Sequence, residues 1–296
     1  MTPRTFLIVL VVLSACTPSS DQTSSSDPGQ VEEAAVMGPT VSVDEIADDV
    51  YRFSYNNHRS LFIATTDGVL VTDPQSPEAA ERYLEEIRKI TDAPIRYLVY
   101  SHYHNDHASG GAVFGDDVVT ISHENVLTHL EDEGMTAVRP PDETFIDEMS
   151  LTIGDIDVNL SFPGHSETDS NIILHVPSRR LVFIVDTLSV RSLPWRNLAS
   201  GDLAGWTAAL ETLSQYDVDQ FVPGHGEIGT HNDVREHLEY FETLTREVTD
   251  RMDDGQSLEA IQASLELPQY STWGGYNEHF VLNIEGFYRE LAEQRQ

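Results

Sequence analysis

The sequence predicts an α/β protein in which residues from position 40 onwards, about 257 in all, form one domain. Short apolar runs of strand length alternate with longer stretches whose apolar residues recur at helical spacing. The hydrophobic content of 40% is high enough to supply a core, which argues against disorder. Alternation of strands and helices along a chain is typical of a layered sheet covered by helices.

The predicted elements follow from these runs and from the turn residues that end them. Strands are expected at residues 41–43, 50–54, 60–65, 68–72, 95–100, 118–121, 156–162, 171–176, 180–185 and 219–222. Helices are expected at residues 77–91, 123–133, 202–215, 232–253, 257–266 and 283–294. The dipeptide Gly201-Asp202 predicts the start of the third helix, because Asp is a favoured N-cap residue.

The net charge of the chain limits the classes of molecule that it could bind. Lys and Arg total 17 and Asp and Glu total 50, which gives a net charge of −33. A chain this acidic repels phosphate, so we expect no nucleic-acid partner. An acid-rich composition with a single lysine, Lys89, favours an exported protein from a saline habitat. The expected partner is a small-molecule substrate, and the oligomeric state is left open.

The first residues predict where the protein is located. An apolar run from Phe6 to Leu13 follows Arg4 and is too short to span a bilayer, so residues 1–15 are interpreted as a signal peptide. The ending Leu13-Ser-Ala-Cys16 resembles a bacterial lipobox, with Cys16, the only cysteine, as the lipidated residue. Ordinary cleavage near Ala15 is the alternative. Residues 16–39 are expected to form the lipidated N-terminus and a disordered tether, with membrane attachment through lipid alone. The expected location is periplasm-facing, with the outer membrane favoured.

One segment concentrates the chemistry of the chain. His102-Tyr-His104-Asn-Asp106-His107 places three imidazoles and a carboxylate directly after the apolar run of residues 95–100. So many polar rings are rarely crowded together unless a metal ion offsets their desolvation. An exposed polar loop is the alternative interpretation.

Three later segments repeat the arrangement of an apolar run followed by a polar residue in a turn. They place His165 after Pro-Gly, Asp186 at a strand end, and His225 after a second Pro-Gly. Three such coincidences favour one shared site.

The order and spacing of these residues resemble the metallo-β-lactamase superfamily over roughly residues 40 to 230. The resemblance implies a four-layer αββα sandwich, here with a helical C-terminal extension, and a site for two Zn²⁺ ions, with Fe or Mn as alternatives. It implies His102, His104 and His165 as ligands of one metal, Asp106, His107 and His225 as ligands of the other, and Asp186 as the bridging carboxylate.

The resemblance further implies a dinuclear zinc hydrolase that uses a metal-bridging hydroxide on a carbonyl substrate such as a β-lactam, a lactone or another acyl compound. Asp106 would orient the nucleophile and transfer its proton. The alternatives are a phosphodiesterase or sulfur-chemistry enzyme on the same scaffold, or a metal-binding accessory lipoprotein without turnover.

For several residues the sequence allows both a functional and an ordinary structural interpretation. Asp73 resembles the carboxylate that steadies the ligand loop, but it could equally be a turn former before Pro74. Arg191 could clamp a substrate carboxylate or pair with a neighbouring acid. Ser189, Ser192 and His58 are further candidates for substrate binding. Trp195 and Trp273 are candidates for lining a pocket or for ordinary packing.

Overall fold

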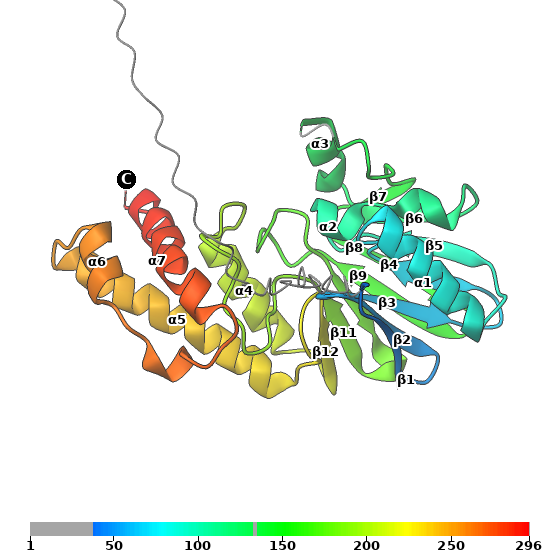
Figure 1. Ribbon diagram of the computed structural model, residues 1–296. Coiled ribbons are helices and arrows are strands. Elements are labelled where there is room, and N and C mark those ends of the chain that lie inside the picture. Colours follow the sequence, from blue (N-terminus) through cyan, green and yellow to red (C-terminus); the bar gives the residue numbers. More distant parts are fainter. Residues whose placement is uncertain (1–37, 133–134, 296) are drawn as a thin grey trace, which may run out of the picture. The chain divides into compact units, whose positions relative to one another are not determined.

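The computed structural model describes residues 38–132 and 135–295 of the chain (Figure 1). The strands are β1 (Val41–Ala47), β2 (Val50–Tyr55), β3 (His58–Ala64), β4 (Val69–Thr72), β5 (Ile95–Val99), β6 (Val119–His123), β7 (Glu143–Phe145), β8 (Glu148–Ile153), β9 (Ile156–Ser161), β10 (Ile173–Val176), β11 (Leu181–Ile184) and β12 (Gln220–Pro223). The α-helices are α1 (Pro77–Ile90), α2 (Asn105–Ala108), α3 (Asn125–Asp132), α4 (Leu203–Leu213), α5 (His231–Asp253), α6 (Leu258–Ser264) and α7 (Tyr276–Glu293). Short 3-10 turns span Gly111–Phe114, Pro177–Arg179 and Pro268–Tyr270.

The strands of the described residues form two sheets. The first has seven strands in the order β1-β2-β3-β4-β5-β6-β7, antiparallel from β1 to β4 and parallel from β4 to β7. The second has five strands in the order β12-β11-β10-β9-β8, and only its β11–β12 pair is parallel. Parallel strands need crossover connections, which is why helices lie between them in the sequence.

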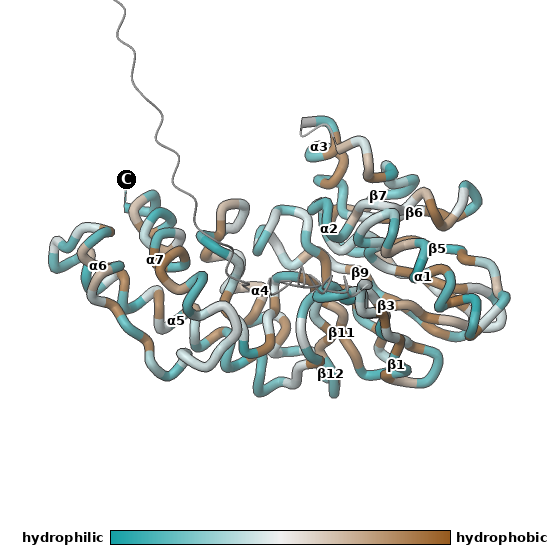
Figure 2. Tube along the Cα trace, viewed as in Figure 1, coloured by the Kyte–Doolittle hydropathy of each residue, from teal (hydrophilic) through white to brown (hydrophobic). Residues whose placement is uncertain are grey.

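The inner faces of the two sheets pack on each other. Leu61 and Ile63 of β3 belong to the same buried cluster as Leu174 of β10 and Phe183 of β11. Figure 2 shows the apolar colouring of these strands. Removal of this apolar surface from water is the main force that holds the sheets together.

Helices cover both outer faces. Tyr83 and Ile87 of α1 pack on the outer face of the first sheet, and Trp206 of α4 and Phe241 of α5 pack on that of the second. Alternation along β11 makes this possible, since Val182 faces α4 and α5 while Phe183 faces the other sheet. The order helix, sheet, sheet, helix confirms the predicted four-layer αββα sandwich.

The element predictions differ from the structure mainly at two places. Strands β7 and β8 are not among the predicted ones, and α7 begins at Tyr276 instead of residue 283. Strand β8 reads Glu-Met-Ser-Leu-Thr-Ile, in which polar and apolar residues alternate strictly, so the sequence carries a strand signal here that the prediction did not use. The predicted N-cap is confirmed, because Asp202 Oδ1 accepts a hydrogen bond from the Gly205 N–H at the start of α4.

The proposed signal peptide (1–15), the lipidation site Cys16 and all of the tether except residues 38 and 39 lie outside the described residues. Among the helices that the structure describes, none is long and apolar enough to cross a membrane.

His237 of α5 makes the stability of the fold depend on pH. Its ring is fully buried beside Phe241, and its Nδ1 lies 2.7 Å from the Ser189 carbonyl oxygen. Burial lowers the pKa of His237 from 6.5 to about 4, so the folded protein holds it neutral. Below pH 6.5 the His237 ring is protonated in the unfolded chain but stays neutral in the folded chain. The free energy of unfolding therefore decreases as the pH falls.

We expect this cost to reach about 2 kcal/mol between pH 7.5 and pH 5. Urea unfolding of the wild type and of His237→Asn at both pH values measures it. The variant should start less stable but lose about 2 kcal/mol less on acidification. Equal losses in the two proteins would show that His237 is not the titrating group.

Candidate metal centre

The functional side chains leave the ends of strands that meet at one edge of the two sheets. Asp73 follows β4, His102 follows β5, Asp186 follows β11 and His225 follows β12. The turn before His225 needs glycine, because a Cβ on Gly224 would lie 2.5 Å from Val185 Cγ1 and 3.2 Å from His107 Cε1. The Pro-Gly signal of the sequence therefore marks a close approach to the site.

A buried carboxylate fixes the loop that carries the histidines. Asp73 accepts hydrogen bonds from the Ser101 N–H (2.8 Å) and the Ser101 hydroxyl (2.7 Å), and its Oδ2 lies 3.3 Å from His107 Nδ1. The expected role of Asp73, steadying the ligand loop, agrees with these contacts.

Three imidazoles are oriented so that Nε2 faces the centre. The Ser101 hydroxyl, which donates to Asp73, lies 2.9 Å from His102 Nδ1. His225 Nδ1 donates to the Asn57 carbonyl oxygen at 2.9 Å, and His107 Nδ1 faces Asp73. With Nδ1 occupied in this way, Nε2 keeps its lone pair for the centre, as metal-binding histidines require.

The first cluster consists of His102, His104, Glu167 and Asp186, whose ligand atoms all lie within 4.8 Å of one another. His102 Nε2 lies 3.7 Å from Asp186 Oδ2 and 3.9 Å from Glu167 Oε2. His104 Nδ1 lies 3.5 Å from Glu167 Oε1.

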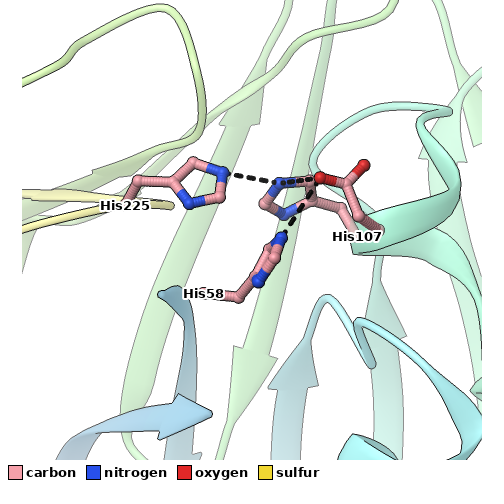
Figure 3. A group of neighbouring side chains, drawn as sticks. His58, His107 and His225 are labelled. Atoms are coloured by element: carbon pink, nitrogen blue, oxygen red, sulfur yellow. Dashed lines mark hydrogen bonds and ion pairs between the residues drawn. The ribbon is translucent and has the colours of Figure 1, made fainter. Parts of the chain in front are cut away.

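The second cluster consists of His58, Asp106, His107 and His225, again within 4.8 Å. His58 Nε2 lies 3.2 Å from Asp106 Oδ2, and His107 Nε2 lies 3.3 Å from His225 Nε2. Figure 3 shows the rings of His58, His107 and His225 pointing toward one another.

Asp186 lies between the clusters. Its Oδ2 is 3.7 Å from His102 Nε2 and 3.6 Å from His107 Nε2, and its Oδ1 is 3.2 Å from His225 Nε2. Its backbone is left-handed (φ 60°), an uncommon conformation for a residue other than glycine that is typical of functional sites. This position agrees with the bridging role expected of Asp186.

His165 does not join the cluster for which the sequence analysis selected it. Its Nε2 lies 2.7 Å from the Ser200 carbonyl oxygen, and the side chain is exposed. Glu167 takes this place in the first cluster. Asn171 Nδ2 donates to Glu167 Oε2 at 3.4 Å and to the Val185 carbonyl oxygen at 3.2 Å, so it links the Glu167 carboxylate to the backbone beside Asp186. The segment His165-Ser-Glu-Thr-Asp offers several polar candidates, and spacing alone does not choose between them.

Burial and the neighbouring charges shift the pKa values of the clustered side chains. Burial and the charges of His107 and His104 lower the pKa of His102 well below its ordinary value. Burial and the charge of Asp186 raise the pKa of Glu167 well above its ordinary value. Burial would lower the pKa of His107, but Asp186 and Asp73 raise it to about 9.

A divalent cation fits these residues. His102 Nε2 and Asp186 Oδ1 are buried and have no hydrogen-bond partner among the described residues, and such atoms are costly unless something binds them. Imidazole nitrogens and carboxylate oxygens are ligands that suit zinc and related metals. The clusters therefore have the donor set and the convergence of a divalent metal site.

A cavity of about 700 Å³ opens onto both clusters, since its walls include His104, Glu167, Asp186 and His225. One wall of this cavity is formed by residues 192, 193 and 195–200, whose apolar side chains include Leu193, Trp195 and Leu198. A second cavity of about 540 Å³ lies on the other side of His58 and Asp106, which line both.

Only some of the candidates for substrate binding lie at a cavity in the structure. Ser189 and Ser192 line the larger cavity, whereas Arg191 lines neither cavity and lies 3.4 Å from Glu236. Arg196, which the sequence analysis did not select, lines the cavity instead.

Three other side chains are also placed. His58 lies in the second cluster, and Trp195 lies in the wall of the larger cavity. Trp273 packs against the core beside Tyr240 and Tyr270.

Comparison with known proteins agrees with this architecture. Residues 56–225 match the family model of the metallo-beta-lactamase superfamily. A metallo-β-lactamase from Pontibacter korlensis has a similar fold, with a TM-score of 0.61, 24% identity and coverage of 69% of this chain and 99% of that one. The sec-alkylsulfatase Pisa1 from Pseudomonas sp. has a TM-score of 0.71 and 16% identity over 84% of this chain and 50% of that one. The chain belongs to the metallo-β-lactamase superfamily, whose members are metal-dependent hydrolases.

Two curated relatives match this chain over only part of their own length. A linear primary-alkylsulfatase from Pseudomonas sp. is 26% identical over 216 residues, which cover 56% of this chain and 40% of the relative. The alpha subunit of a 2,4-dinitroanisole O-demethylase from Nocardioides sp. is 26% identical over 192 residues, which cover 63% of this chain and 58% of the relative. The chain thus spans less than two thirds of the length of these relatives.

Proposed function

We propose that the protein is a dinuclear metal hydrolase that cleaves sulfate esters of organic alcohols. The observation that carries the proposal is the pair of clusters joined by Asp186 at the floor of a cavity with an apolar wall and a free arginine. Similarity to a linear primary-alkylsulfatase supports the choice of substrate.

In this proposal two Zn²⁺ ions bind, with Fe or Mn as alternatives. His102, His104 and Glu167 would hold one ion, Asp106, His107 and His225 the other, and Asp186 would lie between them with His58 at the edge. Zinc so held makes hydroxide available near neutral pH and withdraws charge from the oxygen under attack.

The charge of this ligand set suits a singly charged substrate. Asp106, Glu167 and Asp186 carry three negative charges against four positive charges on two divalent ions, so the loaded site has one net positive charge before hydroxide binds and none once hydroxide is bound. A sulfate monoester carries one negative charge, which the site attracts before hydroxide binds and does not repel as a net charge afterwards.

Asp106 is placed to handle the proton. Its carboxylate is 57% exposed and lines both cavities, so water and substrate can reach it. Partial desolvation would raise the pKa of Asp106, but the hydrogen bond with His58 and the charge of His107 hold it below its ordinary range. Hydrolysis consumes one water and releases an alcohol and hydrogen sulfate, and Asp106 would carry a proton from the water to the leaving alkoxide.

Hydrolysis of a carbonyl substrate is the second candidate, and it is the one that the sequence analysis ranked first. The fold similarity to metallo-β-lactamases over 69% of this chain favours it.

A substrate panel tests both candidates. Zinc-loaded protein is offered decyl sulfate, nitrocefin, an acyl homoserine lactone and bis-nitrophenyl phosphate, with free sulfate measured by ion chromatography. We expect sulfate release to have the highest kcat/KM. Faster turnover of nitrocefin or the lactone would favour the second candidate, and turnover of the phosphodiester alone or of nothing would contradict both.

A further inference from the structure

The wall of the larger cavity that residues 192, 193 and 195–200 form has an unusual backbone. Arg196 (φ 49°) and Leu198 (φ 54°) adopt the left-handed conformation, which is unfavourable for residues with a Cβ. Such conformations persist only where the surrounding structure holds them. The contacts that hold this segment therefore decide what the wall presents.

Helix α7 supplies those contacts. Asn283, fully buried, donates from Nδ2 to the carbonyl oxygens of Pro194 (3.0 Å) and Arg196, while its Oδ1 accepts from Tyr240 (2.6 Å). Arg289 Nη2 donates to the Leu198 carbonyl oxygen at 2.9 Å.

Two further contacts fix Asn197. Its side-chain amide donates to Glu285 at 3.1 Å, and Arg289 Nη1 donates to its carbonyl oxygen at 3.3 Å. Gly286 allows this close approach, because a Cβ there would lie 2.3 Å from the Asn197 carbonyl oxygen. One face of α7 is thus shaped to the backbone of residues 194–198.

This segment presents an aromatic ring and a cation to solvent. Trp195 is 68% exposed, its ring lies 4.6 Å from that of His279, and the Arg196 guanidinium lies 5.2 Å from the ring centroid. Among the arginines and the lysine in the described part of the chain, Arg196 is the one whose side chain has no hydrogen bond or ion pair within the protein. In a chain with a net charge of −33, an arginine left without an acid is available to a ligand.

We propose that α7 forms part of the substrate site by holding Trp195 and Arg196 at the mouth of the cavity as a binding site for an anionic amphiphile. Arg196 attracts the anionic head group, and Trp195 with Leu193 and Leu198 covers the apolar chain. Asn283 and Arg289 are positioning residues that act through the 194–198 backbone. The choice of ligand rests on the proposed sulfatase function.

Binding of decane-1-sulfonate tests the proposal, because this probe keeps the anionic head and the apolar chain but has no ester to hydrolyse. Isothermal titration of zinc-loaded protein compares Arg196→Gln and Arg289→Gln with two matched controls. Arg191→Gln changes an arginine of the same loop that pairs with Glu236, and Arg295→Gln changes an arginine just after α7 that pairs with Asp253.

We expect both test variants to raise the Kd for the sulfonate about tenfold with unchanged metal content, and both controls to leave it within about twofold. Amide hydrogen exchange over residues 194–198 should also be faster in Arg289→Gln, since the loop loses its clamp. Gly286→Ala, which keeps the helix but crowds Asn197, should speed the same exchange.

A wild-type affinity that survives Arg196→Gln would overturn the head-group site, and unchanged exchange and affinity in Arg289→Gln and Gly286→Ala would overturn the role of α7. Failure of the proposed function has a separate signature. If the protein binds the sulfonate in this Arg196-dependent way but releases no sulfate from decyl sulfate, the binding site is supported and the proposed sulfatase activity is contradicted.

Discussion

Substitution of Glu167 by alanine is expected to lower the metal content of the purified protein from about two ions per chain to about one. Glu167 lies against both histidines of the first cluster, at 3.9 Å from His102 Nε2 and 3.5 Å from His104 Nδ1. Loss of this carboxylate leaves that cluster with two imidazoles and the shared Asp186. Elemental analysis after dialysis against metal-free buffer measures the change.

His165→Ala is the matched control, since His165 was the ligand predicted from the sequence and the structure places its ring on the Ser200 carbonyl oxygen. This variant should keep about two ions. Loss of metal in His165→Ala together with retention in Glu167→Ala would reverse the assignment and restore the sequence-based ligand set.

Asp106→Asn is expected to lower kcat about 10³-fold on the best substrate of the panel. The change preserves shape but removes the charge that binds metal and the group proposed to carry the proton. Steady-state kinetics at saturating zinc separates these roles, because a variant that only binds metal weakly recovers activity as zinc is raised.

Asp117→Asn is the control for this substitution, because Asp117 is an exposed acid outside both clusters and both cavities. It should keep the wild-type rate. If Asp106→Asn retained half or more of the wild-type kcat with full metal content, the proton would have to be carried by another group.

The fold could be predicted largely from local patterns. The strands β4 and β11 are buried along their whole length, so each is visible as a short, almost continuous hydrophobic segment. Strand β8 is half-exposed, and its strict alternation of polar and apolar residues is a strand signal that the sequence analysis did not use. Its place in the sheet is set by pairing with β9, which a local pattern does not contain.

The site was predictable where ligands end a strand and not where they depend on distant contacts. His102, Asp106, His107, Asp186 and His225 converge as the sequence analysis expected. His58 joins them because its backbone forms a bridge with His225 and the Arg59 N–H donates to the Gly224 carbonyl oxygen at 2.8 Å. No spacing rule connects positions so far apart.

The same reasoning explains the two arginines of the loop after β11. Arg191 is closer in sequence to Asp186, but its guanidinium lies against Glu236 of α5. Arg196 reaches the cavity wall because α7, almost ninety residues later, holds its backbone in a left-handed turn. Proximity in sequence to a ligand is therefore a weak guide to contact with a substrate.

Anomalous diffraction at the zinc absorption edge, from crystals of the zinc-loaded protein, tests the dinuclear centre most directly. Two peaks are expected, one among His102, His104 and Glu167 and the other among Asp106, His107 and His225, with Asp186 adjacent to both. A single peak, no peak, or a peak coordinated by His165 would contradict the centre described above.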